Sequence, residues 1–287
     1  MPETPAGAPT ADRTLAGRVA LVTGANHGIG AATAVALARR GADVAVSYLR
    51  LPAAHEDPGR PRIYTEQRQA DASDVVAAVE AVGARCFALE ADLSDPALPA
   101  RLFDEAEAAL GPVAILVNNA SGWRKDTFVP EADDRFGRAT DLVSAATFDV
   151  QFHVDARAGA LLIAELAARH RRRVDDEAGG EPWGRIVGLT SGGPQGFPGE
   201  ASYGAAKAAL DNFTMTAAIE LADLGITANV VHPPVTDTGW VTDEVRRFVA
   251  ASDDHFHVSA PAEVAEVIAW LCTDAARLVT GNLIRLR

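Results

Sequence analysis

The fold is decided near the start of the chain by the stretch Val19-Ala20-Leu21-Val22-Thr23-Gly24-Ala25-Asn26-His27-Gly28-Ile29-Gly30. Its four apolar residues predict a short strand, and the glycines that follow open a helix expected over residues 29–40. Gly24 would permit a tight turn, Gly28 would let the backbone approach a pyrophosphate, and Gly30 would let helix and strand pack closely. The helix N-terminus adds free N–H groups and a positive dipole end. The stretch therefore predicts a nucleotide-binding turn rather than an ordinary glycine-rich one.

The same alternation of short strands and longer helices continues along the chain. Strands are expected at 18–23, 43–48, 85–90, 113–118, 185–189, 227–232 and 282–286, with helices at 73–82, 97–110, 148–170, 203–224 and 262–273. Such alternation predicts a parallel sheet covered on both faces. We therefore predict an α/β fold, a single Rossmann-type doubly wound domain with a parallel seven-stranded sheet and helices on both faces. It would span residues 15–287, after a disordered lead-in at 1–14.

Three stretches interrupt this alternation. Residues 49–70 are polar, with prolines and four arginines. Residues 171–182 are charged and predict a surface turn, and residues 233–259 are long enough to be a lid or a binding segment.

Composition narrows the classes of partner. The chain has 287 residues with a formal charge of −13, which argues against nucleic acid or anionic lipid as the main partner. Its two cysteines, Cys86 and Cys272, are far apart and predict neither a disulfide framework nor a metal site. Neither a leader sequence nor an apolar run of the ~20 residues needed to span a membrane is visible. We expect a cytoplasmic protein with no membrane partner.

A candidate proton-transfer pair lies late in the sequence, in Tyr203-Gly204-Ala205-Ala206-Lys207. Spacing of four residues on a helix puts both side chains on one face. An ammonium beside a phenol favours the phenolate and lowers the pKa of the phenol. The pair predicts acid–base chemistry only in combination with other motifs, because such pairs are usually helix surface.

The end of the second strand indicates which dinucleotide binds. An acidic residue there would hold the ribose 2′-hydroxyl of NAD, but the strand ends in Ser47-Tyr48-Leu49-Arg50. Ser47, Arg50 and His27 could accommodate a 2′-phosphate instead, which favours NADP and leaves NAD possible. Arg60, Arg62 and Arg68 could assist, although solvated loop arginines are the usual case.

Further motifs follow the strands in a fixed order. They are Thr23-Gly24-x-x-x-Gly28-Ile29-Gly30, Asp92-Leu93, Asn118-Asn119-Ala120, Thr190-Ser191, Tyr203-x-x-x-Lys207, and Pro233 with Thr236-Asp237-Thr238-Gly239-Trp240. In this order they resemble the short-chain dehydrogenase/reductase family, of the 3-oxoacyl-[acyl-carrier-protein] reductase-like type, over residues 15–286. The resemblance implies a homodimer or homotetramer and a cofactor site. The implied cofactor-binding residues are Thr23, Gly24, Asn26, His27, Gly28, Ile29, Gly30, Ser47, Arg50, Asp92, Leu93, Asn119, Ala120, Tyr203, Lys207, Pro233, Val235, Thr236 and Thr238.

The resemblance also implies catalytic roles. Tyr203 would protonate the substrate carbonyl, Lys207 would lower the pKa of that phenol and bind the nicotinamide ribose, and Ser191 would orient the carbonyl. Thr190 competes for the serine role, because Ser191 lies one residue closer to Tyr203 than is usual in the family. The strand 184–187 runs in register to Ser191, so Ser191 is preferred.

Two residues depart from the family pattern. Asp155 stands where the family usually places an asparagine that holds a water of a proton relay. A carboxylate near Lys207 would weaken the pull of Lys207 on the phenol, whereas a protonated Asp155 could still donate a hydrogen bond. We expect an active enzyme with a shifted pH optimum. Pro234 replaces a usual glycine and changes the loop that enters the nicotinamide site.

These observations predict an NADP-dependent oxidoreductase that interconverts a ketone and a secondary alcohol. The resemblance favours a 3-oxoacyl thioester or a similar small-molecule carbonyl. Two alternatives remain, namely a cofactor-binding protein with weak or no catalysis, and an NAD-preferring dehydrogenase. Trp123, Trp240 and Phe197 are candidates for shaping an apolar substrate pocket, although core packing also explains the tryptophans.

Overall fold

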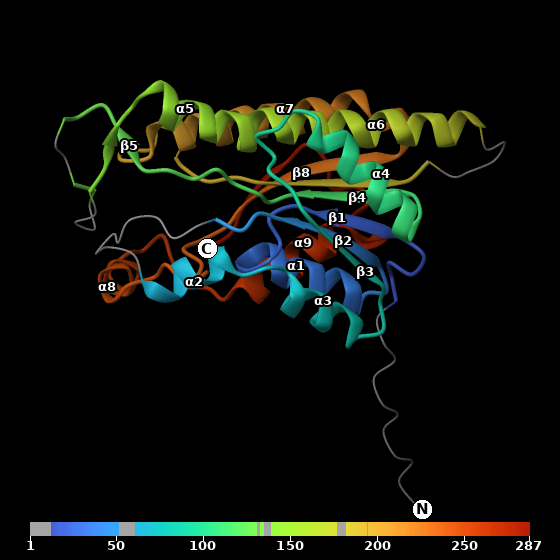
Figure 1. Cartoon of the computed structure of the whole chain (residues 1–287), viewed down its shortest axis with the longest axis horizontal. Coiled ribbons are helices and arrows are strands. Elements are labelled where there is room, and N and C mark those ends of the chain that lie inside the picture. Colours follow the sequence, from blue (N-terminus) through green and yellow to red (C-terminus); the bar gives the residue numbers. More distant parts are fainter. Residues whose placement is uncertain (1–12, 52–60, 131–132, 135–138, 177–181, 194) are drawn as a thin grey trace, which may run out of the picture.

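The computed structural model describes residues 13–51, 61–130, 133–134, 139–176, 182–193 and 195–287. Within these residues, parallel strands form a seven-stranded sheet in the order β3-β2-β1-β4-β7-β8-β9 (Figure 1). The strands are β1 (Val19–Val22), β2 (Asp43–Tyr48), β3 (Cys86–Glu90), β4 (Val113–Asn118), β7 (Gly184–Leu189), β8 (Ile226–His232) and β9 (Leu283–Arg285). The predicted sheet is confirmed. Chain order reverses between β1 and β4, so a crevice is expected at the carboxyl ends of these strands.

Helices cover the two faces of the sheet (Figure 1). The helices α1 (Gly28–Arg39), α3 (Ser73–Glu80) and α9 (Pro261–Leu271) pack on one face. The helices α4 (Leu98–Leu110), α6 (Gly159–Asp176) and α7 (Ala201–Glu220) pack on the other face. Leu37 and Leu102 are fully buried in these two layers, and such burial stabilises the fold by about 1.5–3 kcal/mol for each side chain.

The helix predicted at 148–170 is longer and has an irregular centre. It begins with α5 (Ala145–Gln151), continues through the π-helical segment η1 (Phe152–Ala158), and ends with α6. Ser144 caps its start by accepting a hydrogen bond from the Thr147 N–H. One wider turn changes which side chains face the sheet, and such turns are frequent at functional sites. Asp155 lies within η1.

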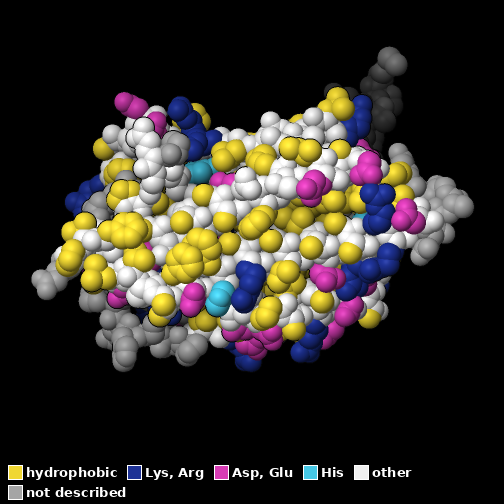
Figure 2. Space-filling view, turned by 90° about the horizontal axis from the view of Figure 1, so that it is seen from above, with side chains coloured by type: hydrophobic (Ala, Val, Ile, Leu, Met, Phe, Trp, Pro, Cys, Tyr) yellow, Lys and Arg dark blue, Asp and Glu magenta, His cyan; other side chains and the backbone are white. Residues whose placement is uncertain are grey.

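The outer surface of α5, α6 and α7 can be seen from above (Figure 2). Hydrophobic side chains are spread among charged ones on this face. Phe148 of α5 and Phe213 of α7 are each about two-fifths exposed, and Ile219 is 80% exposed.

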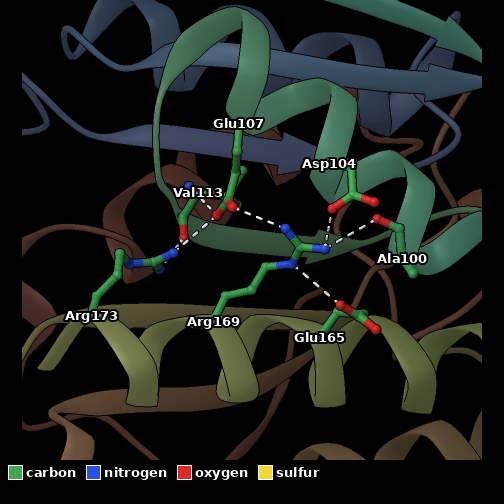
Figure 3. Close-up of polar contacts among 7 residues, drawn as sticks. All are labelled: Ala100, Asp104, Glu107, Val113, Glu165, Arg169 and Arg173. Carbon is green, nitrogen blue, oxygen red and sulfur yellow. Dashed lines mark hydrogen bonds and ion pairs between the residues drawn. The ribbon is translucent and has the colours of Figure 1, made fainter. Parts of the chain in front are cut away.

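The surface turn predicted at 171–182 is wrong for its first residues, because α6 continues to Asp176. Arg169 and Arg173 of α6 both bind Glu107 of α4, at 3.0 and 2.9 Å (Figure 3). Arg173 also donates to the Val113 carbonyl at 2.8 Å. These contacts stabilise one more turn of helix at the end of α6. A surface loop in its place would lose the ion pairs. Residues 177–181 lie outside the described residues.

The other two interruptions contain helices that the sequence analysis did not place. These are α2 (Arg62–Gln69) in the first, and α8 (Asp243–Ala250) in the second. The short strands β5 (Asp126–Thr127) and β6 (Asp141–Leu142) form a separate pair. Most of the predicted lead-in, residues 1–12, lies outside the described residues, whereas Leu15 is fully buried. In the described part of the chain, no helix has the length and apolar character that crossing a membrane requires.

Candidate active site

A cavity of about 1000 Å³ lies at the carboxyl ends of the strands. It is lined by the turn after β1, the ends of β2, β3 and β4, and the loops after β7 and β8. The helices α2, α7 and α8 and the last residues of the chain complete its wall. The predicted site residues that line it are Gly24, Asn26, His27, Gly28, Ile29, Ser47, Asp92, Leu93, Asn119, Ala120, Ser191, Tyr203, Pro233, Val235, Thr236 and Thr238.

The glycine turn has no room for side chains. Gly24 has φ +63°, and a Cβ on it would lie 2.7 Å from the Ala120 Cα. A Cβ on Gly30 would lie 2.5 Å from the Asn119 amide nitrogen. Gly28, with φ +60°, begins α1 and faces the Thr238 side chain. The turn thus leaves bare backbone and a helix N-terminus at the cavity, which fits a dinucleotide pyrophosphate.

Thr23 and Asn119 fix this turn to the end of β4. The Thr23 hydroxyl accepts from the Asn119 and Ala120 N–H groups, both at 3.0 Å, and donates to the Val117 carbonyl at 3.3 Å. The Asn119 amide donates to the Thr23 and Gly24 carbonyls, both at 2.8 Å. Thr23 is buried and does not line the cavity, so it shapes the turn from behind.

Two arginines of the first interruption have different surroundings. Arg50 binds both carboxylate oxygens of Glu90 and is not among the residues that line the cavity. Arg68 of α2 does line the cavity, with its guanidinium 5.5 Å from the centre of the Tyr64 ring. The structure therefore brings Arg68, rather than Arg50, to the cavity wall beside Ser47 and His27.

His27 is neutral at pH 7 in this free state. Burial, and after it the positive charge of Arg68, lower the pKa of His27 to about 4. Its ring contacts the Tyr64 ring edge-on at 6.4 Å, and Tyr64 contacts Trp123 in the same way at 6.4 Å. Tyr64 thus joins the phosphate end of the cavity to the Trp123 side.

Tyr203 lies on the opposite part of the wall, near the start of α7. The Ser191 side chain lies close enough to the phenol to lower its pKa, and the ring centre of Tyr203 lies 6.1 Å from that of Phe197. Ser191 lines the cavity, whereas Thr190 is buried and does not. The geometry therefore favours Ser191 over Thr190 as the hydroxyl that meets a substrate.

Lys207 and Asp155 form a buried ion pair behind Tyr203. The Lys207 Nζ lies 2.8 Å from the Asp155 Oδ1, and the two side chains are 2% and 0% exposed. Lys207 also donates to the Leu189 carbonyl at 2.9 Å. The second carboxylate oxygen accepts from the Gly122 N–H at 2.9 Å and the Ser121 hydroxyl at 3.3 Å. Neither partner is among the residues that line the cavity.

The pKa of Tyr203 is raised well above its usual value. Burial of the phenol is the main cause, followed by the negative charges of Asp155 and Glu200. The contact with Ser191 acts in the opposite direction. The phenol is therefore protonated at neutral pH, as a proton donor must be.

The loop after β8 closes the cavity beside Tyr203. Its Thr236 hydroxyl donates to the Pro234 carbonyl at 2.9 Å, and the Ser259 N–H donates to the Val235 carbonyl at 2.9 Å. His232 places its two ring nitrogens 2.7 and 3.1 Å from the Gly192 and Pro233 carbonyls. Its place is that of a local hydrogen-bonding residue, joining this loop to the one that carries Ser191.

Sequence reasoning did not single out several wall residues, namely Tyr64, Phe248, His255, Arg285 and Arg287. Tyr64 comes from α2, and Phe248 and His255 come from α8 and the loop after it. The arginines in 49–70 were the available signal for α2, but four of them in a polar stretch did not show which one faces the cavity.

Comparisons with known proteins agree with this geometry. A family model described as enoyl-(acyl carrier protein) reductase matches residues 53–286. The chain is 32% identical to a versicolorin reductase of Emericella nidulans over 94% of each chain. It is 30% identical to a hydroxynaphthalene reductase-like protein of Metarhizium guizhouense, over 96% of this chain and 95% of that one. The crystal structure of a blue fluorescent protein from a metagenomic library, in complex with NADPH, is 29% identical with a TM-score of 0.75, covering 95% and 97% of the two chains.

Proposed function

The chain belongs to the short-chain dehydrogenase/reductase family, and we propose that it interconverts a ketone and a secondary alcohol with NADP(H). One observation carries this proposal. The Tyr203 phenol and the Ser191 hydroxyl lie close together at the wall of a cavity whose other end is a bare glycine turn at a helix N-terminus. A dinucleotide held at that turn would extend toward these two hydroxyl groups.

Different residues of the cavity wall would bind different parts of the cofactor. Gly24, Gly28 and the first turn of α1 would hold the pyrophosphate, and Arg68 with His27 would face the 2′-phosphate. The nicotinamide supplies the hydride when it is bound.

The chain's own groups orient the carbonyl and move the proton. Ser191 donates a hydrogen bond to the carbonyl oxygen and holds it beside the Tyr203 phenol. Tyr203 then gives its proton to that oxygen as negative charge develops there. Lys207 anchors the back of this site through the Leu189 carbonyl and Asp155.

Aromatic side chains on the cavity wall favour a flat substrate. Trp123, Phe197, Trp240 and Phe248 all line the cavity. Such rings bury large apolar area and stack on planar molecules. We therefore place a fused-ring aromatic ketone first, in accord with the hydroxynaphthalene named for one relative. A 3-oxoacyl thioester is the second candidate, favoured by the acyl-carrier-protein reductase description of the family model.

A ketone panel tests the function. NADPH oxidation is followed with fused-ring aromatic ketones, 3-oxoacyl thioesters and simple aliphatic ketones, and each is repeated with NADH. We expect turnover with NADPH, fastest with the fused-ring ketones. Fastest turnover with the thioesters would select the second substrate class. NADPH binding, seen as a thermal shift, without turnover of any ketone would favour a cofactor-binding protein without catalysis. Tighter binding of NADH would favour an NAD-preferring dehydrogenase.

A further inference from the structure

The positive charge of Lys207, close to Tyr203, is already balanced by the carboxylate of Asp155. Lys207 favours the Tyr203 phenolate through its positive charge, and its Nζ lies 5.7 Å from the centre of the Tyr203 ring. That charge is paired at 2.8 Å with Asp155, in a place from which water is excluded. The pair as a whole is neutral, so its effect on the phenol is much weaker than that of a lone ammonium.

Asp155 is held as the anion of this pair by its other partners. Gly122 offers a backbone N–H and Ser121 a hydroxyl to one oxygen, while Lys207 meets the other oxygen. A carboxylate that faces donors on both oxygens is in the arrangement that its ionised form requires. The π-helical segment η1 brings Asp155 to this position from the neighbouring helix.

The remaining groups around the phenol also disfavour the phenolate. Burial of the phenol raises the pKa of Tyr203 most, and Asp155, Glu200 and Tyr64 raise it further. The contact with Ser191 lowers it. Burial raises the pKa of Asp211, while the charges of Lys207 and His232 lower it, so Asp211 lies near both of these groups. Asp211 is not among the main groups that shift the pKa of Tyr203.

We propose that Asp155 is a positioning residue that keeps Tyr203 as a neutral phenol and thereby directs this chain toward carbonyl reduction. The inference rests on the function proposed above. In reduction, the carbonyl carbon gains a C–H bond from the hydride, and the oxygen gains an O–H bond as the Tyr203 O–H bond breaks. The cofactor is oxidised, and the phenolate left on Tyr203 recovers a proton from solvent. Alcohol oxidation needs the opposite start, a phenolate that accepts the alcohol proton.

Direct titration of the phenol tests this inference without any substrate. The chain has three tyrosines, so tyrosinate absorbance of a protein minus that of its Tyr203→Phe counterpart reports Tyr203 alone. The titration is run on the cofactor-free parent, on Asp155→Asn, and on Asp211→Asn as a matched carboxyl-to-amide control. Circular dichroism is recorded at each pH, and the proteins are compared only at pH values at which both are folded.

We expect Tyr203 of Asp155→Asn to ionise at least about one pH unit below the parent, a tenfold gain in phenolate at a given pH. Asp211→Asn should titrate as the parent does. Ionisation in Asp155→Asn at the parent's pH, or in neither protein before alkaline unfolding, would overturn the inference. If Asp155→Asn does not fold, Asp155→Ser is titrated in the same way.

Rates in the two directions give the second readout. Both rates are measured with the substrate found by the ketone panel. As pH rises, Asp155→Asn should begin to oxidise the alcohol at a lower pH than the parent does. It should also stop reducing the ketone at a lower pH than the parent does. If the pH profiles of kcat in both directions are the same in Asp155→Asn and in the parent, the inference is contradicted. Absence of turnover in the parent would count against the proposed function, while the titration would still decide the role of Asp155.

Discussion

Ser191 is the residue whose role is most sharply separated from that of its neighbour. Its hydroxyl reaches both the cavity and the Tyr203 phenol, whereas Thr190 is buried behind it. Ser191→Ala removes one donor to the developing oxyanion, so we expect kcat to fall roughly 10²–10³-fold with little change in the NADPH Kd. Thr190→Val is the matched control, measured in the same steady-state assay. A larger loss in the Thr190 variant would move the role to that residue.

Arg68 and Arg50 make a matched pair for cofactor choice. Arg68→Gln removes a charged donor from the cavity wall, so we expect the NADPH Kd to rise roughly 10–100-fold with the NADH Kd unchanged. Arg50→Gln should change neither Kd, because Arg50 is engaged by Glu90. Isothermal titration with both dinucleotides measures the difference. Equal losses for NADPH and NADH would remove Arg68 from the 2′-phosphate site.

We expect NADPH binding to depend on pH through His27. The His27 imidazole has a pKa of about 4 before NADPH binds. A phosphate of NADPH close to the ring would favour the imidazolium, so this pKa should rise in the complex with NADPH. Binding then takes up a proton, and affinity rises as pH falls from the pKa of the complex toward about 4. Calorimetry in buffers of different ionisation enthalpy counts the proton. His27→Gln should abolish this uptake, and uptake that persists in that variant would assign the proton to another group.

At the scale of elements, the sequence predicted the regular repeat and failed in its interruptions. Helix α2 has no buried residue, so no apolar period marks it, and α8 is only eight residues long within a long loop. The wider turn of η1 was not predicted, because it shifts the apolar period by about one residue, which is too small a change to be recognised in so long a helix. Consequently the sequence located Asp155, Tyr203 and Lys207 but could not show that the first pairs with the last.

Arg169 of α6 forms ion pairs with α4, and these contacts, called the clamp below, are the clearest case of a helix held in place by charge. Arg169 is 13% exposed and binds Asp104, Glu107 and Glu165, in addition to the Ala100 carbonyl (Figure 3). Arg169→Ala removes three ion pairs and leaves Glu107 with Arg173 alone, so we expect the free energy of unfolding to fall by about 1–3 kcal/mol.

Arg171 on the same helix is the control for this clamp. It is half exposed and pairs with an exposed Asp223, so Arg171→Ala should cost less than about 1 kcal/mol. Urea denaturation measures both variants, and kcat for folded protein should stay at the parent value in each. Equal costs for the two arginines would show that the partly buried network of Arg169 adds nothing beyond a surface pair.

At the scale of the whole molecule, the cavity and the exposed helical face lie in different places. We propose that the face formed by α5, α6 and α7 joins two copies of the chain, as the exposed Phe148 and Phe213 indicate. Light scattering with size exclusion should then find a dimer or tetramer, and Phe148→Glu with Phe213→Glu should yield a smaller species. A monomeric parent would contradict this assembly. Cytoplasmic location stays a prediction of the sequence.

The central claim is that the Tyr203 phenol delivers the proton in a ketone reduction that uses NADPH. It is tested most directly by NADPH oxidation with the best ketone of the panel, comparing the parent with Tyr203→Phe. The account predicts a loss of kcat of roughly 10²–10⁴-fold in the variant, with the NADPH Kd unchanged because the phenyl ring keeps its packing against Phe197. Equal turnover by the two proteins would contradict it.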